Sequence, residues 1–276
     1  DSFLGAATTR ILEVGYKNRQ ATPSEMERMK GHVENSMKEG AMGIGSSLIY
    51  APGDYASTEE LIELSKVASE YGGMYISHLR SEGTNLLEAL EELISISRNA
   101  NIPAEVYHLK ASREPNWSKL DDVIKRIEEV RKEGLKITAD IYTYNASSTG
   151  LTGVIPTWVQ EGGHRAWINR MKDPEVRPRL LADIREQLDE QPPEGILLVG
   201  FKTSKMSRKY LAKTVAEAAA MRGQTPEEAI VDMVIEDDHR IQCIYFSMSE
   251  DNIRKKIQLP WVSFCSDAGS YSDISK

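Results

Sequence analysis

Cysteine is scarce in this chain, with only Cys243 and Cys265 among 276 residues. Two cysteines cannot build the disulfide framework that stabilises small secreted domains. The scarcity favours a reducing compartment, and we therefore expect a cytoplasmic protein. We interpret Cys243, in the apolar stretch IQCIYF, as a buried filler of the core, and we assign Cys265 no role as a metal ligand.

Long apolar runs and basic clusters are also missing, which narrows the classes of partner. No apolar stretch approaches the roughly 20 residues that a membrane span needs. The formal net charge is −8 and positive residues form no extended run, so nucleic acid and anionic membrane surfaces are poor candidate partners. A small-molecule ligand remains a candidate partner. The composition, with 40% hydrophobic and 28% charged residues, is typical of a globular protein.

Helix boundaries are marked by recurring capping signals. In a capping box, a hydroxyl and a glutamate three residues later each bind the other's backbone amide, and this pattern occupies 22–25, 57–60 and 225–228. The segment 118–121 is a weaker version with aspartate in the glutamate position. Glycines suited to the left-handed residue that ends a helix are Gly40, Gly72, Gly134 and Gly223.

Short runs of apolar, β-branched and aromatic residues predict strands at 41–50, 74–78, 104–108, 136–144, 195–201 and 261–266. Apolar residues spaced with the helical period predict a further helix at 86–100. Strands and helices therefore alternate from 41 to 144, which indicates an α/β fold with a parallel sheet covered by helices. We interpret 145–260 as a helical insertion before the last strand and not as a separate domain.

Histidines end two of the predicted strands. His78 closes MYISH, and His108 closes AEVYH 30 residues later, about the length of one β/α unit. The two histidines are therefore expected on adjacent parallel strands, at the carboxyl edge where β/α barrels carry out their chemistry. Neutral imidazoles that converge there are well placed to share a zinc ion. The alternative is that both are ordinary core or surface histidines.

A third polar residue, Asp267, ends the last predicted strand. A carboxylate across from two histidines can orient a metal-bound water and serve as general base. The alternative is a simple turn, because SDAG is rich in turn residues. The remaining histidines, which we expect at the surface, are His32, His164 and His239.

Longer stretches of the chain resemble the N-acyl-D-amino-acid deacylases (D-aminoacylases) of the amidohydrolase superfamily. The resemblance rests on GAMGIGSSLIYAPGDYASTEELIELSKVASEYGGMYISHLRSEG, YHLKAS, TADIYTYNASSTGL, PTWVQEGG and the terminal SD, which cover essentially the whole chain in order. It implies a partial TIM-like β/α barrel and zinc-dependent hydrolysis of an N-acyl-D-amino acid to a carboxylate and a free D-amino acid. It assigns zinc to His78 and His108, and the role of base and then acid to Asp267.

The resemblance also assigns a substrate pocket, whose segments match Tyr50, Arg80, Lys110, Tyr142 and Ser148. Arg80 and Lys110 each follow a histidine by two residues, so either cation could bind the α-carboxylate of the substrate. The alternative is that both only pair with carboxylates such as Glu82 or Glu114.

The chain departs from the family pattern at both ends. The superfamily's His-x-His pair and the family's cysteine ligand are absent and would precede Asp1, and the segment after the last strand and a small β-sandwich are missing too. We therefore expect 1–276 to be a portion of the catalytic barrel without its early strands. Unpaired strand edges favour association, so a homo-oligomer is also expected.

Two other functions stay open on this sequence. One is the opening of a cyclic amide, as in dihydroorotase- or hydantoinase-like enzymes, although no lysine ends the strand at 41–50 to serve as a bridging ligand. The other is a truncated, catalytically incompetent relative that binds a ligand or a partner without turnover.

Overall fold

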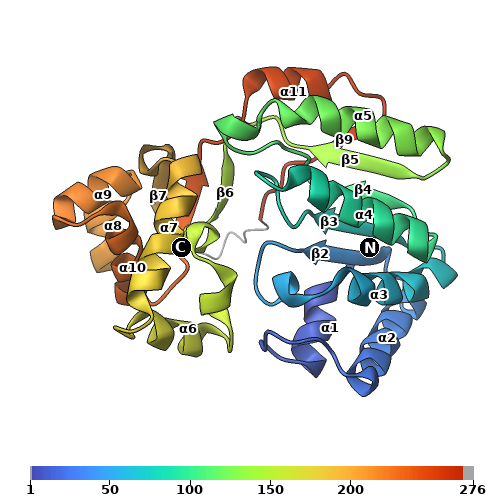
Figure 1. Ribbon diagram of the computed structural model, residues 1–276, viewed down its shortest axis with the longest axis horizontal. Coiled ribbons are helices and arrows are strands. Elements are labelled where there is room, and N and C mark those ends of the chain that lie inside the picture. Colours follow the sequence, from blue (N-terminus) through green and yellow to red (C-terminus); the bar gives the residue numbers. More distant parts are fainter. Residues whose placement is uncertain (1, 270–276) are drawn as a thin grey trace.

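The computed structural model describes residues 2–269, whose strands form two sheets (Figure 1). The larger sheet has six parallel strands in the order β1-β2-β3-β4-β5-β9. Their bounds are β1 (Leu4–Gly5), β2 (Gly43–Ser47), β3 (Met74–His78), β4 (Ala104–Val106), β5 (Ile137–Ile141) and β9 (Val262–Phe264). The α/β class and the alternation from 41 to 144 are confirmed. Within residues 2–269 this sheet is open between β1 and β9, so the described strands do not close a barrel.

Helices pack against the larger sheet and share its hydrophobic core. They are α1 (Ala6–Glu13), α2 (Pro23–Lys38), α3 (Thr58–Glu70), α4 (Leu86–Ala100) and α5 (Lys119–Lys132). A further helix, α11 (Glu250–Lys256), lies near α5 (Figure 1) and precedes β9. In α4, Leu86, Leu90, Leu93 and Ile94 are all buried. Their spacing places them on one face of a 3.6-residue helix, which explains why the apolar pattern of 86–100 specifies this element.

Most of the capping signals operate as predicted. Complete capping boxes begin α2 at 22–25 and α10 (Pro226–Asp237) at 225–228. At α3 the Ser57 hydroxyl accepts from the amide of Glu60, but the Glu60 carboxylate instead pairs with the buried Arg10. The glutamate side of that box is therefore used to join α3 to α1.

The cap predicted at Ser118 is wrong. Ser118 already has helical backbone angles, with φ −65° and ψ −23°, and its side chain caps no amide. A 3-10 turn at Glu114–Asn116 leads almost directly into α5. Ser118 therefore lies in backbone that is already helical, and not in the extended residue that normally precedes and caps a helix. The glycine stops are confirmed, since Gly134 at the end of α5 and Gly223 after α9 (Val215–Arg222) have φ of 102° and 65°.

The insertion contains a second sheet, so the expectation that 145–260 is helical is wrong in part. Its antiparallel strands, in the order β6-β8-β7, are β6 (Ser147–Gly150), β7 (Ile196–Gly200) and β8 (Gln242–Tyr245). Its remaining helices are α6 (His164–Met171), α7 (Arg177–Glu190) and α8 (Ser204–Tyr210). The predicted strand at 195–201 exists, but it joins this sheet. SSTG in β6 has no large apolar residue, and β8 has only four residues, so neither shows a clear strand pattern.

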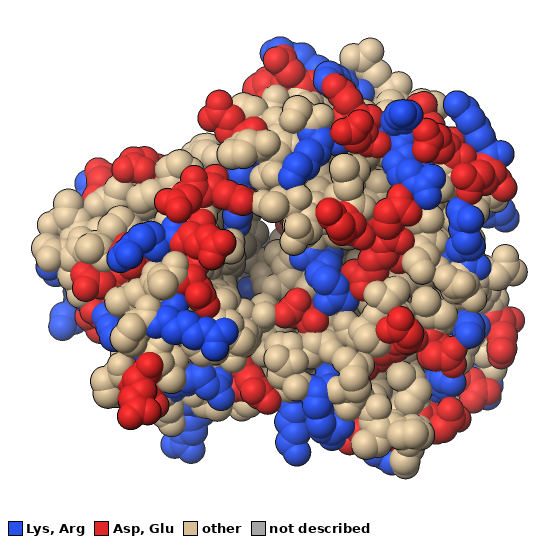
Figure 2. Space-filling model, in the orientation of Figure 1, with Lys and Arg blue, Asp and Glu red and all other residues tan. Residues whose placement is uncertain are grey.

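The insertion has its own hydrophobic core, which includes buried Ile196, Leu198 and Cys243. Figure 1 shows it beside the larger sheet, and the surface is hollowed where the two parts meet (Figure 2). Acidic and basic side chains are interspersed over the face seen in Figure 2. Among the described helices, none combines the length and the apolar character that a membrane crossing requires.

Candidate metal centre

The two predicted histidines lie together at the carboxyl edge of the larger sheet. His78 is the last residue of β3, and β3 pairs with β4 so that Ser77 lies opposite Val106. β4 ends at Val106 and not at His108 as predicted, so His108 belongs to the loop that follows. There its backbone adopts φ 38°, in the left-handed region, which turns the chain away from the strand direction.

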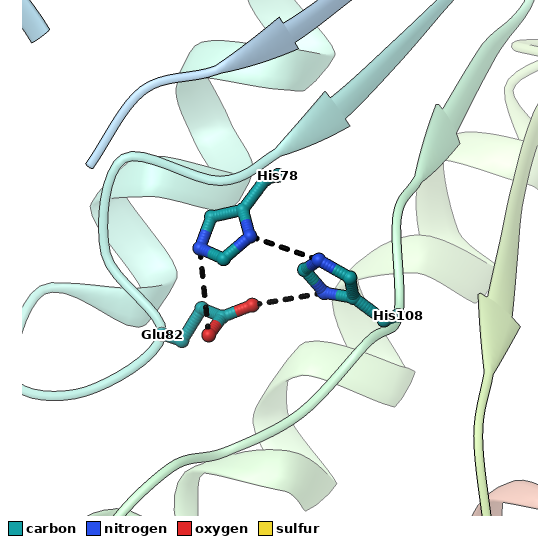
Figure 3. A group of neighbouring side chains, drawn as sticks. All are labelled: His78, Glu82 and His108. Atoms are coloured by element: carbon teal, nitrogen blue, oxygen red, sulfur yellow. Dashed lines mark hydrogen bonds and ion pairs between the residues drawn. The ribbon is translucent and has the colours of Figure 1, made fainter. Parts of the chain in front are cut away.

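A carboxylate completes the group (Figure 3). His78 Nδ1 lies 2.8 Å from His108 Nε2, and the other nitrogen of each ring faces Glu82. The distances are 3.6 Å from His78 Nε2 to Glu82 Oε2 and 3.1 Å from His108 Nδ1 to Glu82 Oε1. One ligand atom from each of the three residues lies within 4.8 Å of the other two.

These three residues fit a metal ion. Two imidazoles and a carboxylate are the ligand set of many zinc sites, and such catalytic sites have three protein ligands. His78 Nε2 is buried and has no hydrogen-bond partner within the described residues. A buried polar atom without a partner is costly, and a metal would satisfy it.

Electrostatics keeps His78 available as a ligand. Burial lowers the pKa of His78 to about 3; the negative charge of Glu82 opposes this shift, and Lys110 and His108 make smaller contributions that lower the pKa further. The ring is therefore neutral near pH 7 and has a free lone pair for a metal. Burial alone would raise the pKa of Glu82, but His78, Lys110 and His108 outweigh it and hold that pKa far below its usual range. The carboxylate is accordingly ionised.

Glu82 was not singled out from the sequence. It follows His78 by four residues in HLRSEG, beyond the end of β3, and a glutamate in a loop is usually solvent-exposed. The only available signal was its short distance in sequence from a strand-end histidine.

Lys110 is buried beside this group. Its Nζ lies 2.6 Å from Glu82 Oε1 and 2.6 Å from His108 Nδ1. The pairing with Glu82 agrees with the alternative given for Lys110 in the sequence analysis, that it pairs with a nearby carboxylate. The ammonium also lies 5.3 Å from the centre of the Tyr142 ring, at the wall of the cavity described below.

Arg80 is held by other residues of the loop region. Its guanidinium forms an ion pair with Glu92 at 2.8 Å and donates to the carbonyl oxygens of Asp54 and Ala56 at 2.7 and 2.9 Å. Four donor contacts are thereby used, which anchors the segment that follows β2 against α4.

A cavity of about 870 Å³ opens in front of the metal group and is lined from both parts of the chain. All of the predicted site residues line it, namely Tyr50, His78, Arg80, His108, Lys110, Tyr142, Ser148 and Asp267. Asp267 is exposed, in the loop after β9. The structure therefore brings strand-end residues and insertion residues to one cavity.

The hydroxyl groups at this cavity come from both sides. Tyr50 OH lies 2.8 Å from Thr149 Oγ1, and Ser148 Oγ donates to the carbonyl of Cys243 at 3.1 Å. Burial raises the pKa of both Tyr50 and Tyr142, so each phenol is protonated near pH 7 and can donate a hydrogen bond.

The metal group itself includes none of the other described histidines or cysteines. His164 and His239 are exposed as predicted, whereas His32 is half-buried and 2.7 Å from Glu13. Cys243 is buried as predicted, and burial raises its pKa far above the ordinary thiol value. Cys265 is half-buried, with Sγ 3.5 Å from Asp140 Oδ1.

Comparison with known proteins supports the resemblance seen in the sequence. No family model matches the chain. The chain is 34% identical to D-aminoacylase of Alcaligenes xylosoxydans xylosoxydans over 149 residues. This aligned region is 54% of this chain and 31% of that protein. The chain is also 29% identical to N-acyl-D-glutamate deacylase of the same organism over 148 residues, a region that is 54% of this chain and 30% of that protein. The chain thus spans about a third of the curated relatives that it matches.

Solved structures show the same fold. The crystal structure of N-acyl-D-glutamate deacylase from Bordetella bronchiseptica, complexed with zinc and a phosphonate inhibitor, superposes with a TM-score of 0.75 at 23% identity. A crystal structure of D-aminoacylase superposes with a TM-score of 0.72 at 24% identity. Each superposition covers 95% of this chain and 46% of the other. The resemblance to the N-acyl-D-amino-acid deacylases is therefore confirmed, for a region that corresponds to part of those proteins.

Proposed function

We propose that this chain carries the metal-binding part of a zinc-dependent N-acyl-D-amino-acid deacylase, which hydrolyses the amide to a carboxylate and a free D-amino acid. The observation that carries the proposal is the group His78, Glu82 and His108, at and just beyond the ends of β3 and β4 and facing a cavity, in a chain that is 34% identical to a D-aminoacylase over 149 residues. A small-molecule substrate follows from the same relatives, which are named for N-acyl-D-amino acids.

His78, His108 and Glu82 would hold the metal, with the histidines as neutral ligands. Zinc in such a site supplies a Lewis acid and lowers the pKa of water to about 7. Glu82 adds a negative charge to the ligand set, and Lys110 lies 2.6 Å from it as a counter-charge. Lys110 thereby limits the net negative charge that the site presents to an anionic substrate.

Asp267 is the proposed general base and acid. It lines the cavity from the loop after β9, on a different segment from the metal group. It would accept the proton of the attacking water and then deliver that proton to the amine nitrogen as the amide bond breaks. This proton transfer is needed because without it the amine nitrogen would leave as an anion, which is a poor leaving group.

For the substrate contacts we propose the residues predicted from the sequence. We expect Lys110 to bind the α-carboxylate in preference to Arg80: the ammonium of Lys110 has two contacts, with Glu82 and His108, and a third donor to offer, whereas Arg80 already makes four donor contacts. Tyr50, Tyr142 and Ser148 would contribute hydroxyl groups that line the cavity.

Paired substrates test this function. The chain, and any longer protein that contains it, would be assayed with N-acetyl-D- and N-acetyl-L-amino acids and a cyclic amide, with Asp267→Asn as the control. Release of free D-amino acid that is lost in Asp267→Asn supports the proposal. Turnover of the cyclic amide alone would favour the hydantoinase-like alternative, and bound zinc without any turnover would favour an incompetent relative.

Two further proposals concern the whole protein. A cytoplasmic location rests on the two free cysteines, of which Cys265 is half-buried and unpaired with Cys243. Association into a homo-oligomer rests on β1 and β9, each of which has one neighbour in the described part of the sheet. Size-exclusion chromatography with light scattering measures the second directly.

A further inference from the structure

Two buried charged side chains outside the metal group act on the loop that carries His108. Asp140, on β5, is 7% exposed, and Lys256, at the end of α11, is 2% exposed. Charged side chains are almost never this buried unless they are paired with another group. Each of these two has a backbone group of the His108 loop as a partner.

Asp140 and Lys256 bind the two sides of one dipeptide. The carboxylate Oδ1 of Asp140 accepts from the backbone amide of His108, and the carbonyl oxygen of Asp140 accepts from the amide of Leu109 at 2.8 Å. The ammonium of Lys256 donates to the carbonyl oxygen of Leu109 at 2.6 Å. Hydrogen bonds to charged groups are stronger than those between neutral groups, so this short segment is held from both directions.

The held segment has an unfavourable backbone conformation. His108 has φ 38°, a region in which residues with a Cβ atom are uncommon. This conformation places the ring next to His78, with 2.8 Å between the facing nitrogens. A relaxed backbone at His108 would turn its ring away from the other two ligands, so the contact from Asp140 has a direct consequence for the metal group.

Lys256 adds an observation that points the same way. Burial lowers the pKa of its amine to about 8, with a further lowering from Lys110 and an opposing effect from Glu82. A residue present only to stabilise the fold would be better served by an apolar side chain at this position, since a buried ammonium opposes folding. Lys256 instead supplies a hydrogen bond that fixes the residue next to a metal ligand.

We propose that Asp140 and Lys256 are positioning residues that hold the backbone of His108 in its left-handed conformation and thereby set the affinity of the site for its metal. The inference rests on the proposed function, because it assumes that His108 binds a metal. It assigns to both residues an effect on metal binding that is separate from their effect on folding.

Metal titration of the full chain tests this inference. The dissociation constant for Zn²⁺ would be measured with a competing chelator for wild type, Asp140→Ala, Asp140→Asn and Lys256→Met. Residues that orient a metal ligand typically change metal affinity by about 10- to 100-fold, so Asp140→Ala and Lys256→Met should each weaken binding within that range. Asn keeps an oxygen that accepts from the His108 amide, so Asp140→Asn should retain more affinity than Asp140→Ala.

A matched control separates positioning from folding. Asp237 is a fully buried aspartate in the insertion that accepts from the backbone amides of Lys202 and Thr203. Asp237→Asn also perturbs a buried carboxylate bound to backbone, but far from the metal group in the fold. It should lower the melting temperature without changing the Zn²⁺ affinity. The visible spectrum of bound Co²⁺, which reports ligand geometry, should change in Asp140→Asn and not in Asp237→Asn.

Each outcome decides the inference. Wild-type Zn²⁺ affinity in Asp140→Ala and Lys256→Met would overturn it while leaving the proposed function intact. No Zn²⁺ binding by the wild type would overturn both. If Asp140→Ala does not fold, Asp140→Asn and Lys256→Met decide by the same criterion, and an unchanged Co²⁺ spectrum and Zn²⁺ affinity in both would refute the positioning role.

Discussion

Lys256 is a buried lysine, and its removal should change how the stability of the chain depends on pH. The side chain is 2% exposed, and its pKa is lowered from 10.5 to about 8, mainly by burial and further by Lys110, while Glu82 opposes the change. The unfolded chain exposes the amine to water, where the ordinary pKa returns. The folded and unfolded chains therefore bind different numbers of protons between these two values.

The sign and size of the effect follow from this difference. Between about pH 8 and pH 10.5 the unfolded chain binds one proton more than the folded chain at Lys256, so the free energy of unfolding rises with pH. Each pKa unit corresponds to about 1.4 kcal/mol, so the contribution grows by about 2 kcal/mol between about pH 7 and pH 9.5. The stabilisation is present above the unfolded pKa and is lost as the pH falls through about 8.

Urea unfolding of the metal-free protein measures this contribution. Wild type and Lys256→Met would be compared at several pH values in the presence of a chelator, with tryptophan fluorescence as the signal. Cysteines and tyrosines also titrate in this range, but they are common to both proteins and cancel in the difference. That difference should change by about 2 kcal/mol in favour of wild type as the pH rises from about 7 to 9.5. A difference that stays constant with pH would refute the reasoning.

Three other perturbations have defined outcomes. His78→Ala or His108→Ala should abolish retention of zinc after dialysis, and stoichiometric zinc by elemental analysis in either variant would contradict the ligand assignment. Arg10→Met should lower the free energy of unfolding by about 3–5 kcal/mol, because it leaves the buried carboxylate of Glu60 unpaired. In urea unfolding, the double variant that combines Arg10→Met with Glu60→Met should regain part of the lost free energy of unfolding. An equal loss in the single and the double variant would count against this explanation. Thr225→Ala removes one side of a capping box and should cost about 1 kcal/mol, measurable as a small decrease in melting temperature.

The fold of 41–144 could be predicted because its signals are local. The apolar face of α4 and the capping hydroxyl of Ser57 act within a few residues, and each agrees with the structure. The second sheet could not be predicted in the same way. β6 is formed by SSTG, and it becomes a strand because Ser147 and its neighbours pair with β8, almost 100 residues later in the chain.

The candidate site shows the same limit. His78 and His108 could be identified because their spacing equals one β/α unit, and register then places them together. Glu82 lies in a loop, and its approach to both rings depends on the path of the chain after β3. Asp140 is a residue in the middle of a strand, and only the left-handed turn at His108 brings a backbone amide to its carboxylate. Long-range geometry of this kind has no periodic signature in a sequence.

The two separate hydrophobic cores have a thermodynamic consequence for any ligand of the cavity. Polar contacts join them, such as Tyr50 OH with Thr149 Oγ1 at 2.8 Å and Tyr55 OH with the carbonyl of Thr157 at 2.7 Å. Cores linked in this way can melt as two cooperative units, because a few hydrogen bonds contribute little net free energy. A substrate that contacts Lys110 on one side and Ser148 on the other is bound only while both cores are folded. Saturating substrate should therefore merge two calorimetric transitions into one, with a van't Hoff enthalpy that approaches the calorimetric enthalpy.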